Sequence, residues 1–212
     1  LATLCDLGID AGVVAYAGHS VGEFTVAAAA GVLTQDAAMK LIAIRGSAMA
    51  VASAATPSGM AAVLGGDEPD VLAAIEAAGC VAANFNCAGQ IVAAGPTPAI
   101  EQLVAEPPAG ARVRPLPVAG AFHTELMASA RTALAAAATV VSTADCDRAV
   151  VSNRDGAVLS TGGEVLARLV DQVCRPVRWD ACMQTLATLG VTAVIELPPA
   201  GTLTAMVRRA LP

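Results

Sequence analysis

The residues best suited to chemistry lie in the segment AYAGHSVGEF, residues 15–24. There, Gly18 and Gly22 flank Ser20 in a G-x-S-x-G pattern, which can hold a nucleophilic serine on a sharp strand-to-helix turn. A structural reading competes with this one, because Ser20 and Glu23 also form an S-x-x-E capping box. The capping box leaves Gly22 unexplained, since glycine costs about 1 kcal/mol relative to alanine inside a helix. A glycine there would let another molecule approach the first turn closely.

A serine hydroxyl needs a base to accept its proton, and the chain has only two histidines. His19 adjoins Ser20, and neighbouring side chains on a turn point in different directions, so His19 is a poor base. His123 lies in VAGAFHTELM, between a predicted strand and a predicted helix, where the sites of α/β proteins are built. We therefore predict His123 as the general base, with a structural histidine bonded to backbone as the alternative.

Arg45 is the third candidate, because it interrupts an otherwise apolar predicted helix, LIAIRGSAM. A buried charge without a partner is costly, so Arg45 either reaches the surface or faces a cleft and binds an anion. A guanidinium can hold a carboxylate through two parallel hydrogen bonds. Met49 lies four residues later on the same helical face and would add an apolar wall, whereas a surface arginine is the plain alternative.

Composition excludes several classes of protein. Hydrophobic residues make up 56% of the 212 residues and charged residues 14%, which favours one sizeable core over disorder. One Trp, one Tyr, three Phe and a net charge of -6 argue against binding of nucleic acid. The long uncharged stretches 46–66 and 77–100 are interrupted by Pro, Gly, Ser or Asn, so we predict no membrane span.

The cysteines form no C-x-x-C pair, and with two histidines they predict no structural zinc site. We expect neither a metal nor a tightly bound cofactor. Scattered cysteines in a chain of this length are typical of reduced, buried thiols in a cytoplasmic protein. The six are Cys5, Cys80, Cys87, Cys146, Cys174 and Cys182.

Strands and helices are predicted to alternate along the chain, which indicates an α/β fold with a mostly parallel central sheet covered on both faces. Strands are predicted over 12–17, 60–65, 80–85, 90–95, 111–116, 148–153 and 191–197. Helices are predicted from the Ser20 turn to about 30, then over 34–55, 68–79, 97–106, 124–139, 163–174, 179–190 and 201–211.

The segment 57–116 follows the order β-α-β-β-α-β of the split ferredoxin-like motif. We therefore predict a small ferredoxin-like subdomain over 57–116, inserted into a larger domain made of 1–56 and 117–212. The chain lacks an initiator Met and opens on LATLCDLGID, which is typical of the end of a helix. We expect the N-terminal part of the natural protein to precede it.

Six motifs together resemble the malonyl-CoA–acyl carrier protein transacylases, in order and in spacing. They are GHSVGEF, RGSAM, NFNCAGQIV, GAFHTELM, DQVCRPVRW and PPAGTL. The resemblance extends over essentially the whole chain, and as a set the motifs are specific, whereas G-x-S-x-G alone is not. It implies a hydrolase-like α/β domain with a ferredoxin-like insertion.

The resemblance also implies roles for individual residues. Ser20 would be the acylated nucleophile, His123 its base, and the backbone carbonyl of Gln172 the group that orients His123 without an aspartate. The N–H of Val21 would be an oxyanion donor, and Arg45 would grip the free carboxylate of the malonyl group.

The resemblance places further residues at the substrate. Phe122 resembles the bulky residue associated with malonyl rather than methylmalonyl preference, and Asn86 and Gln90 match polar residues of the small subdomain near the cleft. Met49 and His19 complete the substrate-binding set that we expect around Arg45.

The expected reaction is a two-step transfer in which malonyl-CoA acylates Ser20 and the phosphopantetheine thiol of an acyl carrier protein removes the malonyl group. We expect a cytoplasmic monomer without nucleic-acid or membrane partners, in fatty acid or polyketide synthesis, alone or within a larger synthase. Carrier proteins are typically acidic, so docking needs a basic patch. The candidates are Arg112, Arg114, Arg175, Arg208 and Arg209.

One departure from the family pattern keeps two alternatives open. The Gly-Gln-Gly-Ser loop that supplies a second oxyanion donor in the family is absent here, and loss of one donor costs about 10²–10³ in rate. An inactive module that only docks a carrier protein is therefore one alternative. An α/β-hydrolase esterase or thioesterase is the other, and it requires an acid between Ser20 and His123. The acids of the small subdomain, none of them suitably placed, are Asp67, Asp70, Glu76, Glu101 and Glu106.

Overall fold

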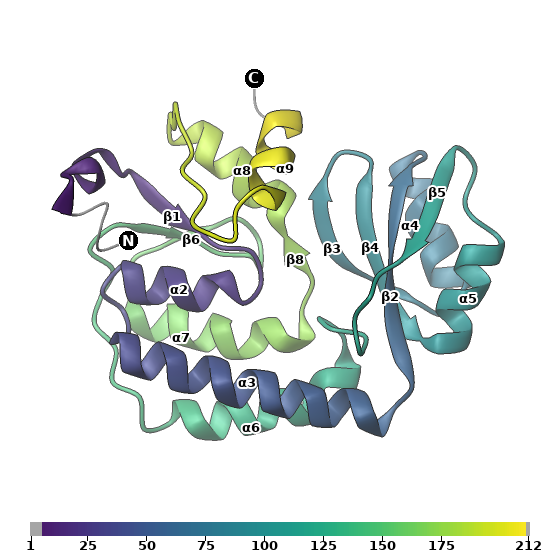
Figure 1. The fold of residues 1–212 in the computed structure, drawn as a ribbon, viewed down its shortest axis with the longest axis horizontal. Coiled ribbons are helices and arrows are strands. Elements are labelled where there is room, and N and C mark those ends of the chain that lie inside the picture. The colour runs from purple at the N-terminus through teal and green to yellow at the C-terminus, as the bar shows by residue number, and fades with distance from the viewer. Residues whose placement is uncertain (1–5, 211–212) are drawn as a thin grey trace.

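Two β-sheets organise this mixed α/β chain in the computed structural model, which describes residues 6–210 (Figure 1). The long helix α3 (Gln35–Ala55) leads from the first sheet to the second, and the segment after β5 returns the chain. Cys5 and the first residues of the predicted N-terminal helix end lie outside the described residues.

The first sheet has three strands in the order β1-β6-β7. Strand β1 runs parallel to β6, and β6 runs antiparallel to β7. The strands are β1 (Ala15–Ala17), β6 (Ala149–Val151) and β7 (Val158–Leu159). The helices that share its hydrophobic core are α2 (Gly22–Ala29), α3, α6 (Ala128–Ala138) and α7 (Gly162–Asp171).

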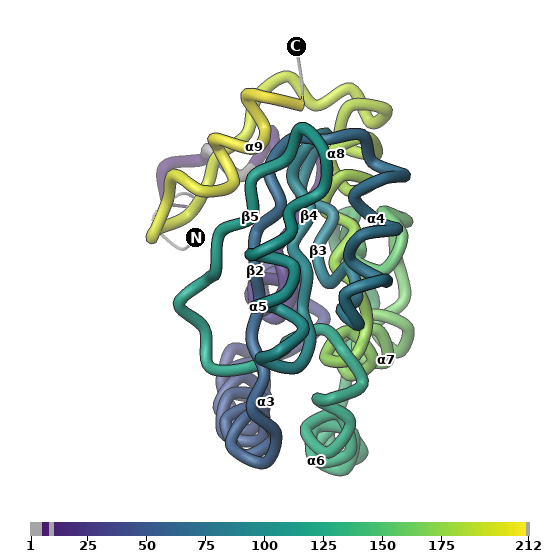
Figure 2. Tube along the Cα trace, turned by 90° about the vertical axis from the view of Figure 1, so that its right-hand side faces the viewer, coloured from purple at the N-terminus to yellow at the C-terminus, as the bar shows by residue number. Residues whose placement is uncertain are grey.

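The second sheet has five strands in the order β5-β2-β4-β3-β8, and every neighbouring pair is antiparallel except β3 with β8. The strands are β2 (Ser58–Gly65), β3 (Val81–Cys87), β4 (Gln90–Pro96), β5 (Ala111–Pro115) and β8 (Val177–Arg178). Helices α4 (Glu68–Ala77) and α5 (Thr97–Ala105) bury one face of this sheet (Figure 2). The other face packs on the segment around Ala121 and Phe122, just before His123.

Strand β8 connects the two halves of the molecule, because it pairs with β3 and continues directly into α8 (Trp179–Thr188). Short 3-10 helices precede it at η3 (Gln172–Cys174) and occur at η1 (Ile9–Gly12) and η2 (Glu125–Met127). The last helix, α9 (Thr202–Ala210), packs beside α8 and β3.

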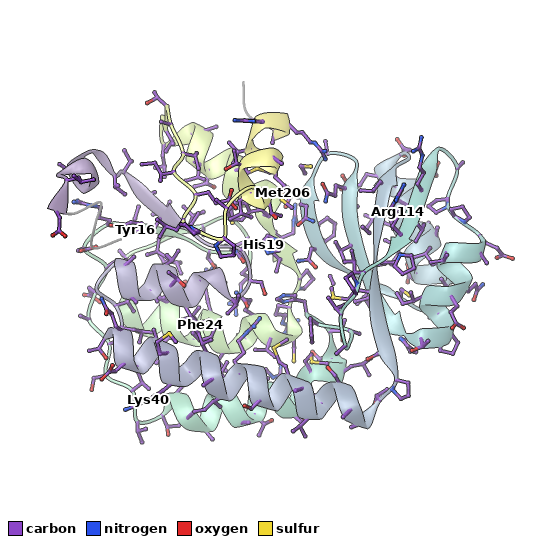
Figure 3. The ribbon with its side chains drawn as sticks, in the orientation of Figure 1. Tyr16, His19, Phe24, Lys40, Arg114 and Met206 are labelled. Atoms are coloured by element: carbon purple, nitrogen blue, oxygen red, sulfur yellow. The ribbon has the colours of Figure 1, made fainter. Side chains whose placement is uncertain are left out.

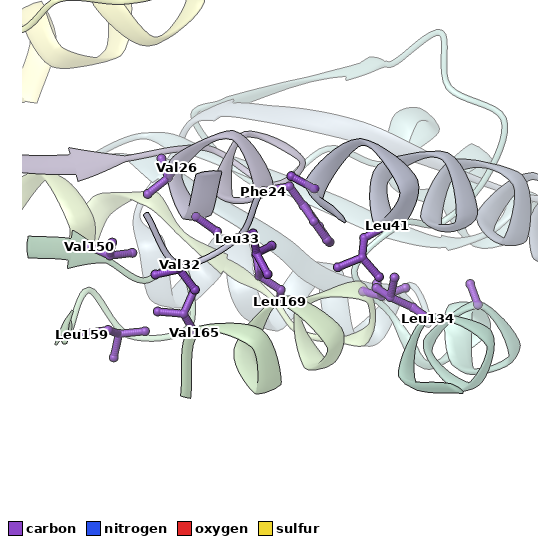
Figure 4. Packing of buried hydrophobic residues seen from close by; sticks show 14 of the residues in the cluster. Phe24, Val26, Val32, Leu33, Leu41, Leu134, Val150, Leu159, Val165 and Leu169 are labelled. Carbon is purple, nitrogen blue, oxygen red and sulfur yellow. The ribbon is translucent and has the colours of Figure 1, made fainter. Parts of the chain in front are cut away.

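The predicted helix over 34–55 is confirmed as α3, and the Thr34 hydroxyl oxygen accepts the N–H of Ala37 at 3.2 Å as its N-cap. By length and composition alone α3 could cross a membrane. In this fold, however, its buried face packs Leu41 against the core, next to Leu134 of α6 (Figure 4). It therefore acts as a core helix that also carries Arg45.

Two predictions about the sheets are wrong for the described residues. The first sheet is not mostly parallel, because one of its two strand pairs is antiparallel. The predicted strand over 191–197 has no regular structure, and its side chains Val194, Ile195 and Leu197 are exposed. A strand needs a backbone partner for its N–H and C=O groups, and within residues 6–210 no strand pairs with this segment.

Candidate active site

Ser20 lies on a strained turn between β1 and α2, with φ at +53°. The N-cap of α2 is Val21 and no side chain caps it, so the capping box of Ser20 and Glu23, the structural alternative, does not form. A Cβ on Gly18 would lie 2.3 Å from the carbonyl carbon of Gly22, so only glycine fits at position 18. A Cβ on Gly22 would meet no atom within 4 Å, which leaves the first turn of α2 open to an approaching molecule.

Ser20 and His123 form a hydrogen-bonded dyad. The Oγ atom of Ser20 lies 2.8 Å from Nε2 of His123, and Nδ1 of His123 lies 2.9 Å from the backbone carbonyl oxygen of Gln172. Because a carbonyl oxygen only accepts, Nδ1 must carry the proton, which leaves Nε2 free to accept the proton of Ser20. The dyad is therefore set for general-base activation of a serine.

The same contact bears on the esterase alternative. That reading requires a carboxylate on Nδ1 of the histidine, whereas here a backbone carbonyl from Gln172 holds Nδ1. In the described part of the chain, none of the five acids considered for the esterase alternative forms a hydrogen bond with His123.

Burial keeps His123 neutral at physiological pH. His123 is almost fully buried, and loss of solvation lowers its pKa to about 4. The hydrogen bond to Gln172 opposes this effect, while the charge of Arg45 adds to it. A neutral imidazole is the form that can accept a proton.

Arg45 meets the dyad rather than the surface, so the surface-arginine alternative is wrong. Its Nη2 donates to Oγ of Ser20 at 3.0 Å and to Oε1 of Gln172 at 3.3 Å, and the side chain is 7% exposed. Burial lowers its pKa to about 10, which leaves it charged at pH 7. Its buried Nε has no hydrogen-bond partner, so the guanidinium retains donor capacity for an anion next to Ser20.

Beneath the dyad lies a group of three buried side chains, here called the buried amide network: Glu23, Asn153 and Gln172. One oxygen of Glu23 accepts the backbone N–H of Asn153 at 2.7 Å, and the other accepts the side-chain amide of Gln172. Burial raises the pKa of Glu23 to about 7, although both N–H groups favour its ionised form. Gln172 was expected only through its backbone carbonyl, but its side chain is equally engaged.

Of the other predicted substrate-binding residues, some contact the Ser20 turn and others contact different parts of the fold. Nε2 of His19 lies 3.0 Å from Oδ1 of Asn86, which ties the Ser20 turn to β3, and Figure 3 shows His19 at the N-terminal end of α2. Oε1 of Gln90 instead accepts hydrogen bonds from Arg209 at 3.4 Å and from Cys87 at 3.7 Å. Met49 is buried in the core, and Phe122 packs at its margin beside His123.

The N–H of Val21 finds no acceptor among the described residues, whereas the next three N–H groups donate to the carbonyls of His19, Ser20 and Val21. An unpaired N–H beside Ser20, at a helix N-terminus, is suited to stabilise an oxyanion. Residues 6–210 contain no group of three or more metal-ligating side chains, and their five cysteines are free thiols.

Comparison with known proteins places these features in context. A family model described as the acyl transferase domain matches residues 1–212. The malonyl CoA-acyl carrier protein transacylase of Mycobacterium bovis is 53% identical over 195 residues, covering 92% of this chain. The chain spans 65% of that relative's length.

Two solved structures are similar as well. The crystal structure of MCAT from Mycobacterium tuberculosis has a TM-score of 0.95 and 50% identity, covering 99% of this chain and 70% of that one. A type II PKS acyl-carrier protein in complex with its malonyl-transacylase has a TM-score of 0.87 and 26% identity, covering 99% and 71%.

Proposed function

Because the chain belongs to the acyl transferase domain family, we propose that it moves a malonyl group from malonyl-CoA to the phosphopantetheine thiol of an acyl carrier protein. The observation that carries this proposal is the meeting of Ser20, His123 and Arg45 within hydrogen-bonding distance. The transacylase names of its relatives, and the carrier-protein complex of one structural neighbour, support the choice of substrates.

In the first step His123 Nε2 takes the proton of Ser20 as Oγ attacks the thioester carbonyl carbon. The oxyanion that forms accepts the N–H of Val21, at the positive end of α2. The intermediate then collapses, the carbon–sulfur bond breaks, and the departing thiolate takes the proton from His123. The product is a malonyl ester on Ser20 and free coenzyme A.

In the second step the carrier's thiol gives its proton to His123 and attacks the malonyl ester. The carbon–oxygen bond to Ser20 breaks, and Oγ recovers the proton from His123. The same imidazole therefore acts as base and acid in each half-reaction, which is ping-pong chemistry.

Arg45 supports malonyl as the transferred group. Only one methylene separates the malonyl carboxylate from the carbonyl that Ser20 attacks, so the cation that binds the carboxylate must lie close to Oγ. Nη2 of Arg45 meets this condition. Phe122, packed beside His123, is the residue that we propose limits room for a methyl branch.

We further propose that residues 57–116 form a ferredoxin-like subdomain within a hydrolase-like domain of 1–56 and 117–212. The antiparallel order β5-β2-β4-β3, with α4 and α5 on one face, supports this division. The dyad then lies where the two subdomains meet, since the His19 to Asn86 hydrogen bond spans them. A cytoplasmic monomer, serving fatty acid or polyketide synthesis, stays a prediction.

Labelling with radioactive malonyl-CoA tests the proposal. The purified protein should take up about one malonyl group per chain, peptide mapping should find it on Ser20, and addition of acyl carrier protein should remove it to the carrier thiol. Ser20→Ala should take up none. Equal labelling of Ser20→Ala would exclude the proposed nucleophile, and release of free malonate without carrier labelling would indicate a hydrolase.

A further inference from the structure

The buried amide network contains a residue that none of the predicted roles includes. Asn153 follows β6, 133 residues from Ser20, and its side chain is fully buried. Its Oδ1 accepts the backbone N–H of Ser20 at 2.7 Å, and its Nδ2 donates to the carbonyl of Gly18 at 2.8 Å. One side-chain amide therefore binds the turn on both sides of His19.

These two contacts bear directly on the position of the nucleophile. Ser20 has φ at +53°, a conformation that costs a non-glycine residue about 1–3 kcal/mol and persists only where its surroundings enforce it. Two of the three side-chain hydrogen bonds of Asn153 are to backbone atoms of the turn, and the third runs from Nδ2 to Sγ of Cys182 at 3.6 Å. Asn153 therefore holds Ser20 in the conformation that places its Oγ within hydrogen-bonding distance of His123.

Glu23 in turn holds Asn153. Both of its carboxylate oxygens act as acceptors, one for the backbone N–H of Asn153 and one for the amide of Gln172. The same Gln172 amide donates to the carbonyl of Ser20 at 2.9 Å, and the Gln172 backbone orients His123. Glu23 therefore couples the position of the nucleophile to the position of its base.

We propose that Asn153 is a positioning residue for acyl transfer, which holds Ser20 in its left-handed conformation, and that Glu23 fixes Asn153 in place. The identity of the reaction in this proposal rests on the proposed function. The contacts of Asn153, in contrast, affect only how reactive the Ser20 hydroxyl is. A reagent that reacts with activated serines without any malonyl group, such as a small fluorophosphonate, therefore tests the two separately.

The first experiment compares the rate of fluorophosphonate labelling of Ser20 in the purified protein and in Asn153→Ala. A displacement of about 1 Å at a reacting atom can cost 10²-fold in rate, so we expect a loss of about 10²-fold. Asn153→Asp keeps an acceptor for the Ser20 N–H but loses the donor to Gly18, and should react at an intermediate rate. Glu23→Gln has one acceptor oxygen where two are needed, and should be slowed as well.

The matched control is Asn84→Ala, which removes another buried asparagine, on β3, that has no hydrogen bond to the network. Its labelling rate should equal that of the parent. A general loss of folding would instead slow both alanine variants alike, and that result would overturn the positioning role.

A second measurement separates positioning from substrate binding. Calorimetry of malonyl-CoA with Ser20→Ala and with Ser20→Ala/Asn153→Ala should give dissociation constants within about twofold, the scatter of uncoupled sites. A parallel loss of binding and labelling would overturn the proposal, because Asn153 would then support the whole pocket. Absence of malonyl-CoA binding to either protein, with normal fluorophosphonate labelling of the parent, would reject the proposed function alone.

A third measurement needs no variant and remains decisive if Asn153→Ala does not fold. Amide hydrogen exchange followed by NMR should find the Ser20 N–H protected, because it donates to a buried side chain. Exchange of this amide at the rate of an open loop would overturn the proposal.

Discussion

At the scale of single residues, the two members of the dyad share an uncommon backbone conformation. Ser20 and His123, with φ of +53° and +63°, are the non-glycine residues of the described chain that have positive φ. Each such residue costs about 1–3 kcal/mol, and such residues concentrate at functional sites. The Ser20 N–H donates to Oδ1 of Asn153, and Nδ1 of His123 donates to the carbonyl of Gln172. These contacts hold both residues where Oγ of Ser20 lies 2.8 Å from Nε2 of His123.

Substrate preference is expected to depend on Arg45. Replacement by alanine removes charge-assisted hydrogen bonds worth about 1.5–3 kcal/mol, so kcat/KM for malonyl-CoA should fall at least about 10-fold relative to acetyl-CoA. Acetyl-CoA carries no free carboxylate and should keep most of its reaction. Single-turnover acylation of Ser20 with each thioester measures the ratio. Arg131→Ala on α6 is the control, and equal losses on both thioesters in Arg45→Ala would contradict a carboxylate site.

The pH dependence of acylation is expected to report the burial of His123. Its pKa is lowered to about 4, and only the neutral ring accepts the Ser20 proton. Glu23 has a pKa of about 7, and its protonation removes an acceptor oxygen, so it should slow acylation as the pH falls through 7. In Glu23→Gln this step is absent, and the rate should stay level from pH 7 to about 5 and decline as the pH falls through about 4. Stopped-flow labelling in buffers of constant ionic strength gives the profile. A midpoint near 6.5 in Glu23→Gln, the value of a solvated histidine, would show that the ring is open to water in solution.

At the scale of elements, the two glycines around Ser20 have different purposes. Gly18→Ala places a Cβ 2.3 Å from backbone atoms of Gly22, so the start of α2 must shift. We expect it to abolish acylation and to lower the melting temperature. Gly22→Ala meets no atom, so stability should be unchanged or higher, while the KM for malonyl-CoA should rise because the first turn is partly covered. Thermal melts and acylation kinetics of both variants check this, and equal effects would contradict it.

The elements also show what a single sequence could predict. The helices, such as α3 with its Thr34 cap, follow from local pattern and capping. The segment 191–197 has an apolar, β-branched sequence but no partner strand among the described residues, so local pattern alone was misleading. Strands β7 and β8 have two residues each, too short to leave a periodic signal.

The sequence allowed prediction of those site residues whose type and local context already suggest a chemical role. A serine between glycines, one loop histidine and one arginine in an apolar helix indicated Ser20, His123 and Arg45 without any structure. The role of Asn153, at the end of the predicted strand 148–153, could not be recognised from the sequence, because its side chain binds backbone atoms of a turn 133 residues away. Glu23 was interpreted as a cap, since its partners Asn153 and Gln172 are 130 and 149 residues distant.

At the scale of the whole molecule, the proposed carrier protein is acidic and this chain has a net charge of -6, so docking needs a local basic surface. Arg208 and Arg209 end α9, which packs beside β3, the strand whose Asn86 reaches the Ser20 turn. The alternative pair, Arg112 and Arg114, lies on β5 at the far edge of the five-stranded sheet, as Figure 3 shows for Arg114. The pair on α9 is therefore the one nearer to the nucleophile.

Charge reversal distinguishes these two surfaces. We expect Arg208→Glu/Arg209→Glu to raise the KM for carrier protein about 10-fold or more, because like charges would then face each other at the docking surface. The effect should diminish at high salt, as screening shortens the reach of exposed charges. Acylation of Ser20 by malonyl-CoA provides the internal control for an intact site, and Arg112→Glu/Arg114→Glu is the matched surface control. A larger effect from the β5 pair would move the docking surface to the far edge of the sheet, and no effect from either pair would remove electrostatics as its basis.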